Sequence, residues 1–306
     1  MTISLKHKFQ SAKSDGSDSS LVKPSNWNDE HDLTLASGRV LGRTSSGAGA
    51  AEELDAATVR TFLGGRLPPG HIHGLLISNN STDSTNDIDI SAGTCRSDDD
   101  TEDMVLTASR TKRLDASWAV GSGNGGRDTG SISNNWWYVW LIKRTDTGVV
   151  DALFSLSATS PTMPTNYTKK RRIGAINRSS GAIRAFTQVP SDPDRFLLAN
   201  FALDVNASDL GTSSVSYTLT CPPNMVALFR AESEDFSGLY TVLRSLVESD
   251  AAPTEGFSSL AGSDFDSGHF ELATNASSQI AARASHEGTF LAIGTYGWRD
   301  TRGRLA

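Results

Sequence analysis

The most specific chemical pattern in this sequence is the histidine pair His71 and His73. Residues two apart in an extended chain point the same way, so both imidazoles would lie on one side of a strand. Three chains around a threefold axis would then offer two imidazoles each to one octahedral transition metal. The competing interpretation is a turn-capping or surface histidine, because the motif follows Pro68-Pro69-Gly70. We expect no other cofactor.

Carboxylates gather between residues 83 and 103 and could supply the acid and base of a polysaccharide depolymerase. They are Asp83, Asp87, Asp89, Asp98, Asp99, Asp100, Glu102 and Asp103. The stretch 97–103 could also bind Ca²⁺, although it lacks the ordered spacing and central glycine of the known calcium loop. Acidic stretches of this kind are more often solvated loops. Enzyme signatures such as GxSxG, a Walker loop or HExxH do not occur, and we therefore predict that the protein is not an enzyme.

Aromatic and basic residues near the C-terminal end are candidates for contact with a receptor. Tyr296, Trp298 and Arg299 lie in one short stretch. Tryptophan and arginine are the usual hot-spot residues of interfaces, and tryptophan also stacks on sugars. The structural alternative is that Trp298 closes a β-sandwich core and that Arg299 and Asp300 pair locally.

Composition excludes several functional classes. The net charge is −7, and the longest basic run is Lys169–Arg172, which we interpret as a strand edge or a local ion-pair cluster. Nucleic acid is therefore not an expected partner. No apolar run is long enough to span a bilayer and the sequence starts without a signal-peptide pattern, so we expect synthesis in a cytoplasm and no membrane insertion. Cys95 and Cys221 are predicted to be buried free thiols rather than a disulfide.

Residues 1–67 are predicted to form an extended arm that other molecules hold in place. The segment is polar and carries two isolated aromatic anchors, Phe9 and Trp27. A short strand is expected at 39–43 and a helix at 55–63, with Asp55 as its N-cap. Val59, Phe62 and Leu63 share one face of that helix. Because this apolar stripe is too small for a monomeric core, we predict a homotrimer.

The remaining chain is predicted to be mainly β, with a β-rich middle domain over 68–190 and a sandwich-like or jelly-roll-like domain over 191–306. Large apolar residues occupy both faces of the predicted strand Trp136–Arg144. This favours burial in a core over exposure as a sugar-stacking platform. That run and Val149–Leu156 form a predicted hairpin. The other expected strands are His73–Ser78, Asp87–Ser91, Asp103–Ala108, Arg172–Asn177, Ile183–Val189, Phe196–Val205, Ser213–Thr220, Met225–Ala231, Gly238–Leu246, Ser267–Ala273, Ile280–Ala284 and Thr289–Tyr296.

Four long stretches resemble virion proteins of tailed bacteriophages, usually described as tail-fibre or tail proteins of alphaproteobacterial phages and prophages. They are 7–31 (HKFQSAKSDGSDSSLVKPSNWNDEH), 39–64 (RVLGRTSSGAGAAEELDAATVRTFLG), 67–93 (LPPGHIHGLLISNNSTDSTNDIDISAG) and 113–176, which begins RLDASWAVGSGNGG. The resemblance covers about the first two thirds of the chain. It implies a trimeric virion structural protein that is mounted on the particle by its N-terminal segment, without naming the part of the particle.

These observations leave three functions open. The first is a tail fibre or receptor-binding appendage in the virion, in contact with other virion proteins through residues 1–65 and with a host glycan or protein. The second is a head or collar fibre or a capsid decoration protein without a receptor role. The third, a polysaccharide depolymerase, is disfavoured because nothing catalytic stands out.

Overall fold

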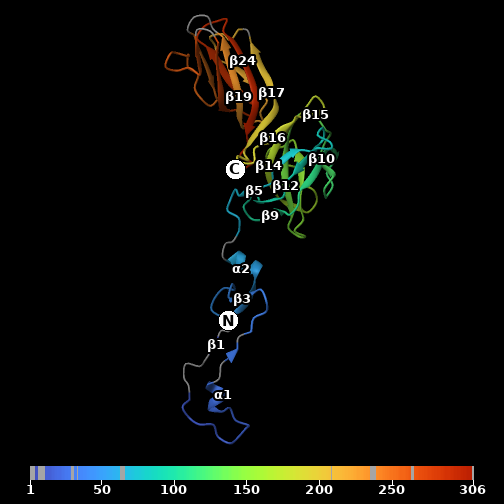
Figure 1. The fold of residues 1–306 in the computed structure, drawn as a ribbon, viewed down its shortest axis with the longest axis vertical. Helices are drawn as coiled ribbons and strands as arrows, with labels where there is room; N and C mark the ends of the chain where they lie inside the picture. Colours follow the sequence, from blue (N-terminus) through green and yellow to red (C-terminus); the bar gives the residue numbers. More distant parts are fainter. Residues whose placement is uncertain are drawn as a thin grey trace. The chain divides into compact units, whose positions relative to one another are not determined.

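The chain forms two compact units, Met1–Arg66 (unit 1) and Leu67–Ala306 (unit 2). The structure is a computed structural model and describes residues 4–5, 11–28, 31–32, 34–62, 66–207, 209–234, 239–262 and 265–304 (Figure 1). Strands account for 47% of the chain and helices for 4%, which confirms the predicted mainly β fold.

The described residues of unit 1 form two two-stranded sheets and two short helices. β1 (Ser4–Leu5) pairs with β2 (His31–Asp32), and β3 (Arg39–Gly42) pairs with β4 (Glu52–Asp55). The helices are α1 (Pro24–Asn28) and α2 (Ala56–Phe62). Asp55 caps α2 as predicted, because its Oδ1 accepts a hydrogen bond from the Thr58 backbone N at 2.7 Å. One strand and one helix were expected here, and β1, β2, β4 and α1 were not predicted.

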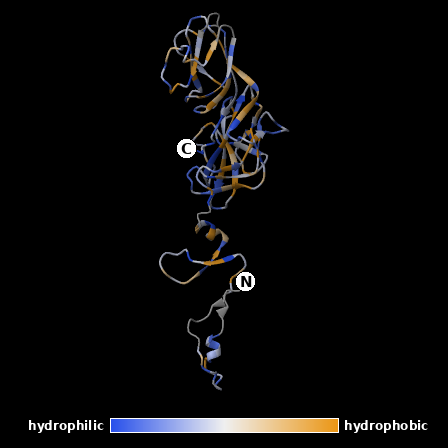
Figure 2. Ribbon diagram, turned by 60° about the vertical axis from the view of Figure 1, so that its left-hand side comes forward, coloured by the Kyte–Doolittle hydropathy of each residue, from blue (hydrophilic) through white to orange (hydrophobic). Residues whose placement is uncertain are grey.

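The described apolar residues of unit 1 include Val40 and Leu41 in β3, Leu54 in β4 and Val59 and Phe62 in α2, together with Leu21 and Val22 before α1. In contrast, α1 is mainly hydrophilic (Figure 2). Among the described side chains of unit 1, Leu54 alone is a buried apolar residue. A two-stranded hairpin beside a seven-residue helix is marginal without further packing.

Unit 2 is built on one thirteen-stranded sheet. Its order is β15 (Ala182–Ile183), β14 (Tyr167–Ser179), β12 (Trp136–Arg144), β13 (Val150–Ser155), β11 (Asn124–Arg127), β10 (Arg110–Ser117), β7 (Asp87–Ile90), β6 (Ile77–Asn79), β16 (Phe186–Gln188), β17 (Arg195–Ala207), β24 (Phe290–Arg299), β19 (Val226–Glu234) and β22 (Phe265–Ala273). Strands from both predicted domain ranges join this sheet, since β16 pairs with β17 through Phe186 and Leu198.

Two smaller sheets complete unit 2. The first contains β5 (Ile72–Gly74), β8 (Gly93–Arg96) and β9 (Asp103–Leu106). The second contains β18 (Val215–Thr218), β23 (Gln279–Ala284), β20 (Leu239–Arg244) and β21 (Leu260–Gly262). Side chains of this second sheet and of β17, β24 and β19 share one hydrophobic core, as in a β-sandwich.

Strand β12 is buried on both faces. Trp137, Val139 and Leu141 point to one side and Tyr138, Trp140 and Ile142 to the other, and all six are buried. The prediction that these tryptophans form a core is confirmed. Cys95 and Cys221 are free, buried thiols. Burial raises the pKa of Cys95 to about 12 and also raises that of Cys221, so neither is a ready nucleophile.

Candidate functional site

The structure separates the three predicted receptor-contact residues. Trp298 is fully buried, and its ring stacks on Phe196 with centroids 5.2 Å apart. Trp136 meets the same indole edge-on at 5.0 Å. The interpretation of Trp298 as a receptor contact is therefore wrong, because a side chain with no exposed surface cannot touch a ligand. It closes the core, which was the structural alternative.

A β-bulge explains why Trp298 and Tyr296 differ. In the pairing of β19 with β24, Phe229 pairs with Thr295 and Leu228 with Gly297, so the ladder skips Tyr296. One extra residue changes which face of the sheet the following side chains occupy. Simple alternation would have placed both aromatic residues on one face.

Arg299 forms ion pairs that tie β24 to its surroundings. Its Nη1 lies 2.9 Å from Asp192 Oδ2 and its Nε lies 3.0 Å from Glu271 Oε2. These two carboxylates raise the pKa of Arg299. Asp300, the partner expected from sequence, instead accepts from Arg172 Nη2 at 2.7 Å. The guanidinium is therefore a structural tie that remains partly exposed.

Tyr296 lies in a groove of about 390 Å³ on the outer face of β17, β24, β19 and β22. The other lining residues are Phe201, Leu203, Arg230, Glu232, His269, Ala292 and Gly294. Leu203, Gly294, Arg230 and His269 follow one another across the four strands in register. A side chain at Gly294 would collide with the Phe201 ring 2.9 Å away, so the glycine is what lets this ring lie over β24. We call this feature the Tyr296 groove.

The two walls of the Tyr296 groove differ in chemistry. Phe201 and Leu203 are 67% and 59% exposed and form an apolar wall. On the other side Arg230 and Glu232 lie 3.8 Å apart, and His269 lies beside Tyr296 with ring centroids 5.5 Å apart. The groove can therefore take a group that is apolar along one edge and hydrogen-bonding along the other. Sequence reasoning found Tyr296 alone, because spacing shows that Phe201 and Leu203 share a face without showing which face is open.

No protein-family model matches the chain, and no curated protein matches it significantly.

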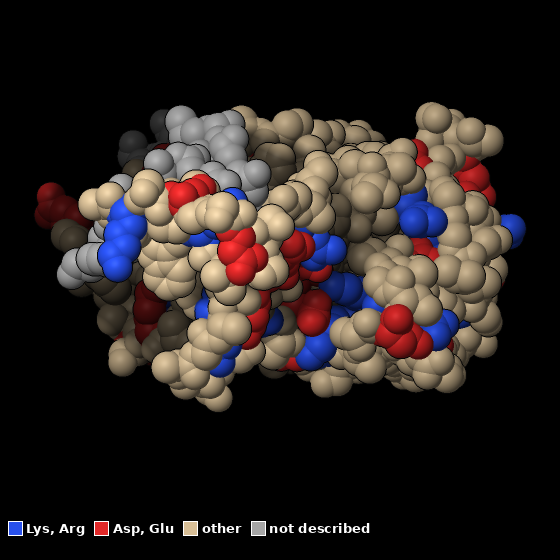
Figure 3. Space-filling view, turned by 90° about the horizontal axis from the view of Figure 1, so that it is seen from below, with Lys and Arg blue, Asp and Glu red and all other residues tan. Residues whose placement is uncertain are grey.

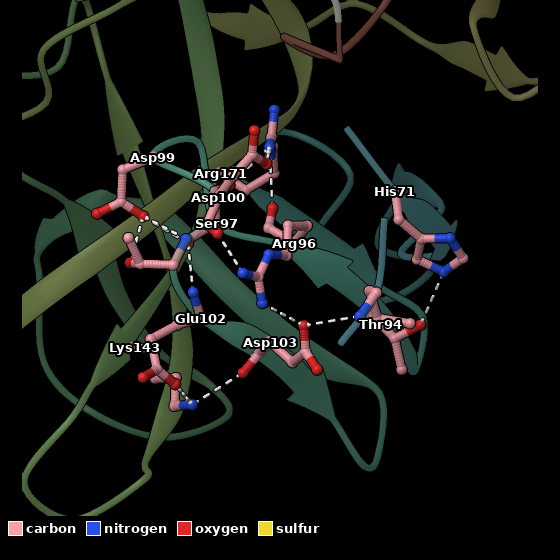
Figure 4. A network of polar contacts seen from close by, with 12 residues as sticks. His71, Thr94, Arg96, Ser97, Asp99, Asp100, Glu102, Asp103, Lys143 and Arg171 are labelled. Carbon is pink, nitrogen blue, oxygen red and sulfur yellow. Dashed lines mark hydrogen bonds and ion pairs between the residues drawn. The ribbon is translucent and has the colours of Figure 1, made fainter. Parts of the chain in front are cut away.

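The acidic stretch 97–103 is paired with three residues of the basic run, Lys169, Lys170 and Arg171. Figure 4 shows Arg171 beside Ser97 and Asp100. Lys169 Nζ lies 2.6 Å from Asp99 Oδ2, and Lys170 pairs with Asp98. Arg171 donates to the carbonyls of Arg96 and Ser97, each at 2.7 Å. The ion-pair reading of the basic run is thus confirmed. In agreement, Lys and Arg are interspersed with Asp and Glu on the face seen in Figure 3.

The remaining carboxylates of this region are also engaged in structure. Glu102 holds Lys143 at 2.8 Å, and Asp103 holds Arg96 at 2.8 Å. Asp83 accepts from the backbone of its own turn, while Asp89 accepts from Thr111 Oγ1 at 2.6 Å. Asp87 differs, since burial and the neighbouring Asp83 raise its pKa. Among the described residues, no group of three metal-ligating side chains could hold an ion.

The histidine pair lies at the start of unit 2. His71 Nε2 is 3.5 Å from Thr94 Oγ1, and His73, exposed in β5, pairs with Thr94 across the sheet (Figure 4). In this arrangement the imidazole of His71 contacts the Thr94 hydroxyl, as expected of a surface histidine. The threefold metal site stays a prediction that depends on a trimer.

Two of the three predicted assembly anchors of unit 1 that lie in the described residues are exposed. Trp27 in α1 is 44% exposed and Phe62 in α2 is 64% exposed, while Val59 is half-buried. Phe9 and Leu63 lie outside the described residues. No helix in the described part of the chain is long and apolar enough to cross a membrane.

Proposed function

We propose that this protein is a structural appendage of a phage virion, mounted on the particle by unit 1 and presenting unit 2 to the host. One observation carries the proposal: unit 1 places large apolar side chains on its surface instead of in a core. The exposed set among the described residues is Leu21, Val22, Trp27, Val40, Leu41 and Phe62. Exposed apolar patches of this kind mark surfaces that are covered by a partner.

Three copies of unit 1 would supply part of the missing core. Hairpin β3–β4 has two open edges, and Val40 and Leu41 in β3 and Phe62 in α2 are exposed. Packing these side chains around a threefold axis would bury them against their own copies. Trp27 lies in α1, between β1 and β2, and would then dock on another virion protein. A homotrimer mounted through unit 1 is therefore the assembly that we propose.

Unit 2 supplies the host-facing surface in this proposal. The Tyr296 groove is open and combines aromatic, apolar and charged side chains in one place. Interfaces favour such aromatic and arginine-rich centres. The alternative is a head or collar fibre, or a decoration protein, which would use the same mount without a receptor.

Immunogold labelling of a C-terminal tag on purified virions tests the location. Label at the tail tip or fibres is the expected result and supports host attachment. Label on the capsid or neck would favour the decoration alternative. Absence of the protein from purified, infectious particles by mass spectrometry would overturn the proposal.

Paired substitutions test the mount separately. Phe62→Ala should lower the mass of the purified protein from trimer to monomer by light scattering and reduce its incorporation into particles. Phe257→Ala is the matched control, since Phe257 is also an exposed phenylalanine but belongs to unit 2. Equal incorporation of both variants with an unchanged trimer would contradict the role of the exposed face of α2.

A further inference from the structure

A second cleft, which shares no residue with the Tyr296 groove, opens beside Trp118. It encloses about 630 Å³ and is lined by Ser117, Trp118, Val120, Asp128, Arg144, Thr147, Val149, Thr162, Met163, Pro164, Thr165 and Tyr167. The lining comes from the ends of β10 and β12, from the β10–β11 loop, from the residue after β11, from the β12–β13 turn, from the loop that leads to β14 and from the first residue of β14. We call it the Trp118 cleft.

The aromatic part of the Trp118 cleft is held rigidly. The Trp118 and Tyr167 rings meet edge-to-face, with centroids 5.1 Å apart and planes at 76°. Trp118 Nε1 donates to the Ala152 carbonyl at 3.0 Å, which ties the indole to β13. Lys112 Nζ lies 5.4 Å from the centroid of the same indole. A fixed aromatic wall loses little entropy when a ligand binds to it.

A buried ion pair anchors the loop that carries Trp118. Lys112 Nζ donates to the carbonyl of Ala119 at 2.7 Å and lies 3.5 Å from Asp151 Oδ2. That same carboxylate oxygen accepts from the Gly121 backbone N at 2.8 Å. Both ionic side chains are fully buried, and their contacts fix this loop to β10 and β13. The cleft is preformed rather than dependent on a ligand.

The polar part of the cleft offers both donors and acceptors. Asp128 Oδ2 accepts from the Thr162 backbone N at 2.9 Å, and a carboxylate oxygen can accept a second bond. Arg144 uses Nε and Nη2 to hold Asp146 at 3.0 and 2.6 Å, which leaves Nη1 for another acceptor. Hydroxyls of Thr147, Thr162 and Thr165 complete the rim. Because Asp146 balances Arg144, the rim has no excess positive charge.

We propose that the Trp118 cleft binds a sugar ring of a neutral polysaccharide. A pyranose has an apolar C–H face that packs on an aromatic ring, and hydroxyls at its edge that donate to a carboxylate and accept from a guanidinium. Such a pairing of apolar wall and convergent polar groups is what a small-molecule site needs. The Asp128 carboxylate disfavours acidic sugars. The proposal goes beyond the proposed function, since binding is a property of the purified chain and needs no particle.

Saturation-transfer NMR on the purified full-length protein tests the inference. The neutral probes are the methyl glycosides of glucose, galactose, mannose and N-acetylglucosamine, and the acidic probe is methyl galacturonoside. We expect saturable binding of at least one neutral probe and a weakening of about tenfold or more in Trp118→Ala. No binding of any neutral probe, or tighter binding of the acidic probe, would overturn the proposal.

Two further variants separate loss of the site from loss of the fold. Arg144→Gln removes a partly exposed hydrogen-bond donor from the rim of the cleft. It should therefore weaken the binding of the neutral probe without lowering the midpoint of thermal unfolding. Phe257→Ala changes an exposed aromatic side chain that lines neither cleft and should leave probe binding unchanged, whereas Tyr296→Ala reports on binding in the other groove. If Tyr296→Ala abolishes binding and Arg144→Gln does not, the sugar binds elsewhere and the assignment of the Trp118 cleft is wrong. Virion labelling remains an independent test of the mount.

Discussion

At the scale of single residues, Trp298 and Tyr296 have opposite roles although they lie two positions apart. Trp298→Ala should lower the free energy of unfolding by about 3–5 kcal/mol, because it removes a fully buried ring from between Phe196 and Trp136. Tyr296→Ala should change it by about 1 kcal/mol or less, since this side chain is partly exposed in a groove. Urea unfolding of both variants measures the difference. Equal losses would contradict the bulge that separates the two side chains.

Asp99 predicts a pH effect at the same scale. Burial raises the pKa of Asp99, but hydrogen bonds from Lys169, Ser97 and Thr101 outweigh it and hold the pKa below its ordinary value. A depressed carboxyl pKa stabilises the fold above the unfolded-state pKa, about 3.9, and this contribution is lost as pH falls toward the folded-state value. Asp99→Asn should therefore lose less stability than wild type between about pH 5 and pH 2.

Urea unfolding at several pH values checks this expectation. Glu287→Gln is the matched control, because it removes an equal charge at an exposed position without that set of hydrogen bonds. If the free energy of unfolding of Asp99→Asn changes with pH as steeply as that of wild type and of Glu287→Gln, the Asp99 contacts do not stabilise the folded state.

At the scale of elements, β10 depends on the ion pair between Lys112 and Asp151. Burial lowers the pKa of Lys112, although Asp151 beside it raises it. Lys112→Met should destabilise the protein by about 3–5 kcal/mol, because it removes the fully buried cation beside the Asp151 carboxylate and leaves only the partly exposed Arg110, whose Nε is 3.7 Å away. The double variant Lys112→Met/Asp151→Asn should lose less than Lys112→Met alone, since the remaining amide is neutral and its oxygen can still accept one of the two backbone hydrogen bonds, from Gly121 or Ala152, that the carboxylate accepts. Chemical unfolding of both variants decides this, and a double variant less stable than the single one would contradict it.

Strands β12, β10 and β11 show how much of the fold can be predicted from the sequence. Strand β12 was predicted with both of its bounds, because aromatic and branched residues fill it without interruption. β10 was missed because its residues RTKRLDAS read as a charged loop, and the partner that allows Lys112 to be buried lies far along the chain. β11 was missed because NGGR reads as a turn. A Cβ at Gly125 would lie 2.0 Å from the Ser117 carbonyl oxygen, so close packing between β10 and β11 requires glycine there.

Both candidate sites depend on such long-range placement. The Tyr296 groove joins residues from four strands, and its exposed Phe201 and Leu203 look in sequence like ordinary strand residues. In the Trp118 cleft, Trp118 comes from the β10–β11 loop and Tyr167 from the start of β14, and strand pairing elsewhere brings the two together. Residue type and spacing identified Tyr296 as a candidate, but which strand faces remain open is determined by sheet topology.

At the scale of the whole molecule, the two units should differ in their capacity to fold alone. Unit 2 holds all but one of the buried apolar side chains of the described residues, and its core extends from Leu75 to Trp298. A fragment of residues 67–306 should therefore unfold cooperatively in urea at the same midpoint as the full chain, monitored by tryptophan fluorescence.

A fragment of residues 1–66 at low concentration should show no cooperative transition by circular dichroism, because it cannot offset the entropy of ordering its chain. Raising its concentration should restore a transition if copies of unit 1 bury one another, and the midpoint should then depend on concentration. A concentration-independent cooperative transition of the short fragment would show that unit 1 needs no partner, and would remove the observation on which the proposed mount rests.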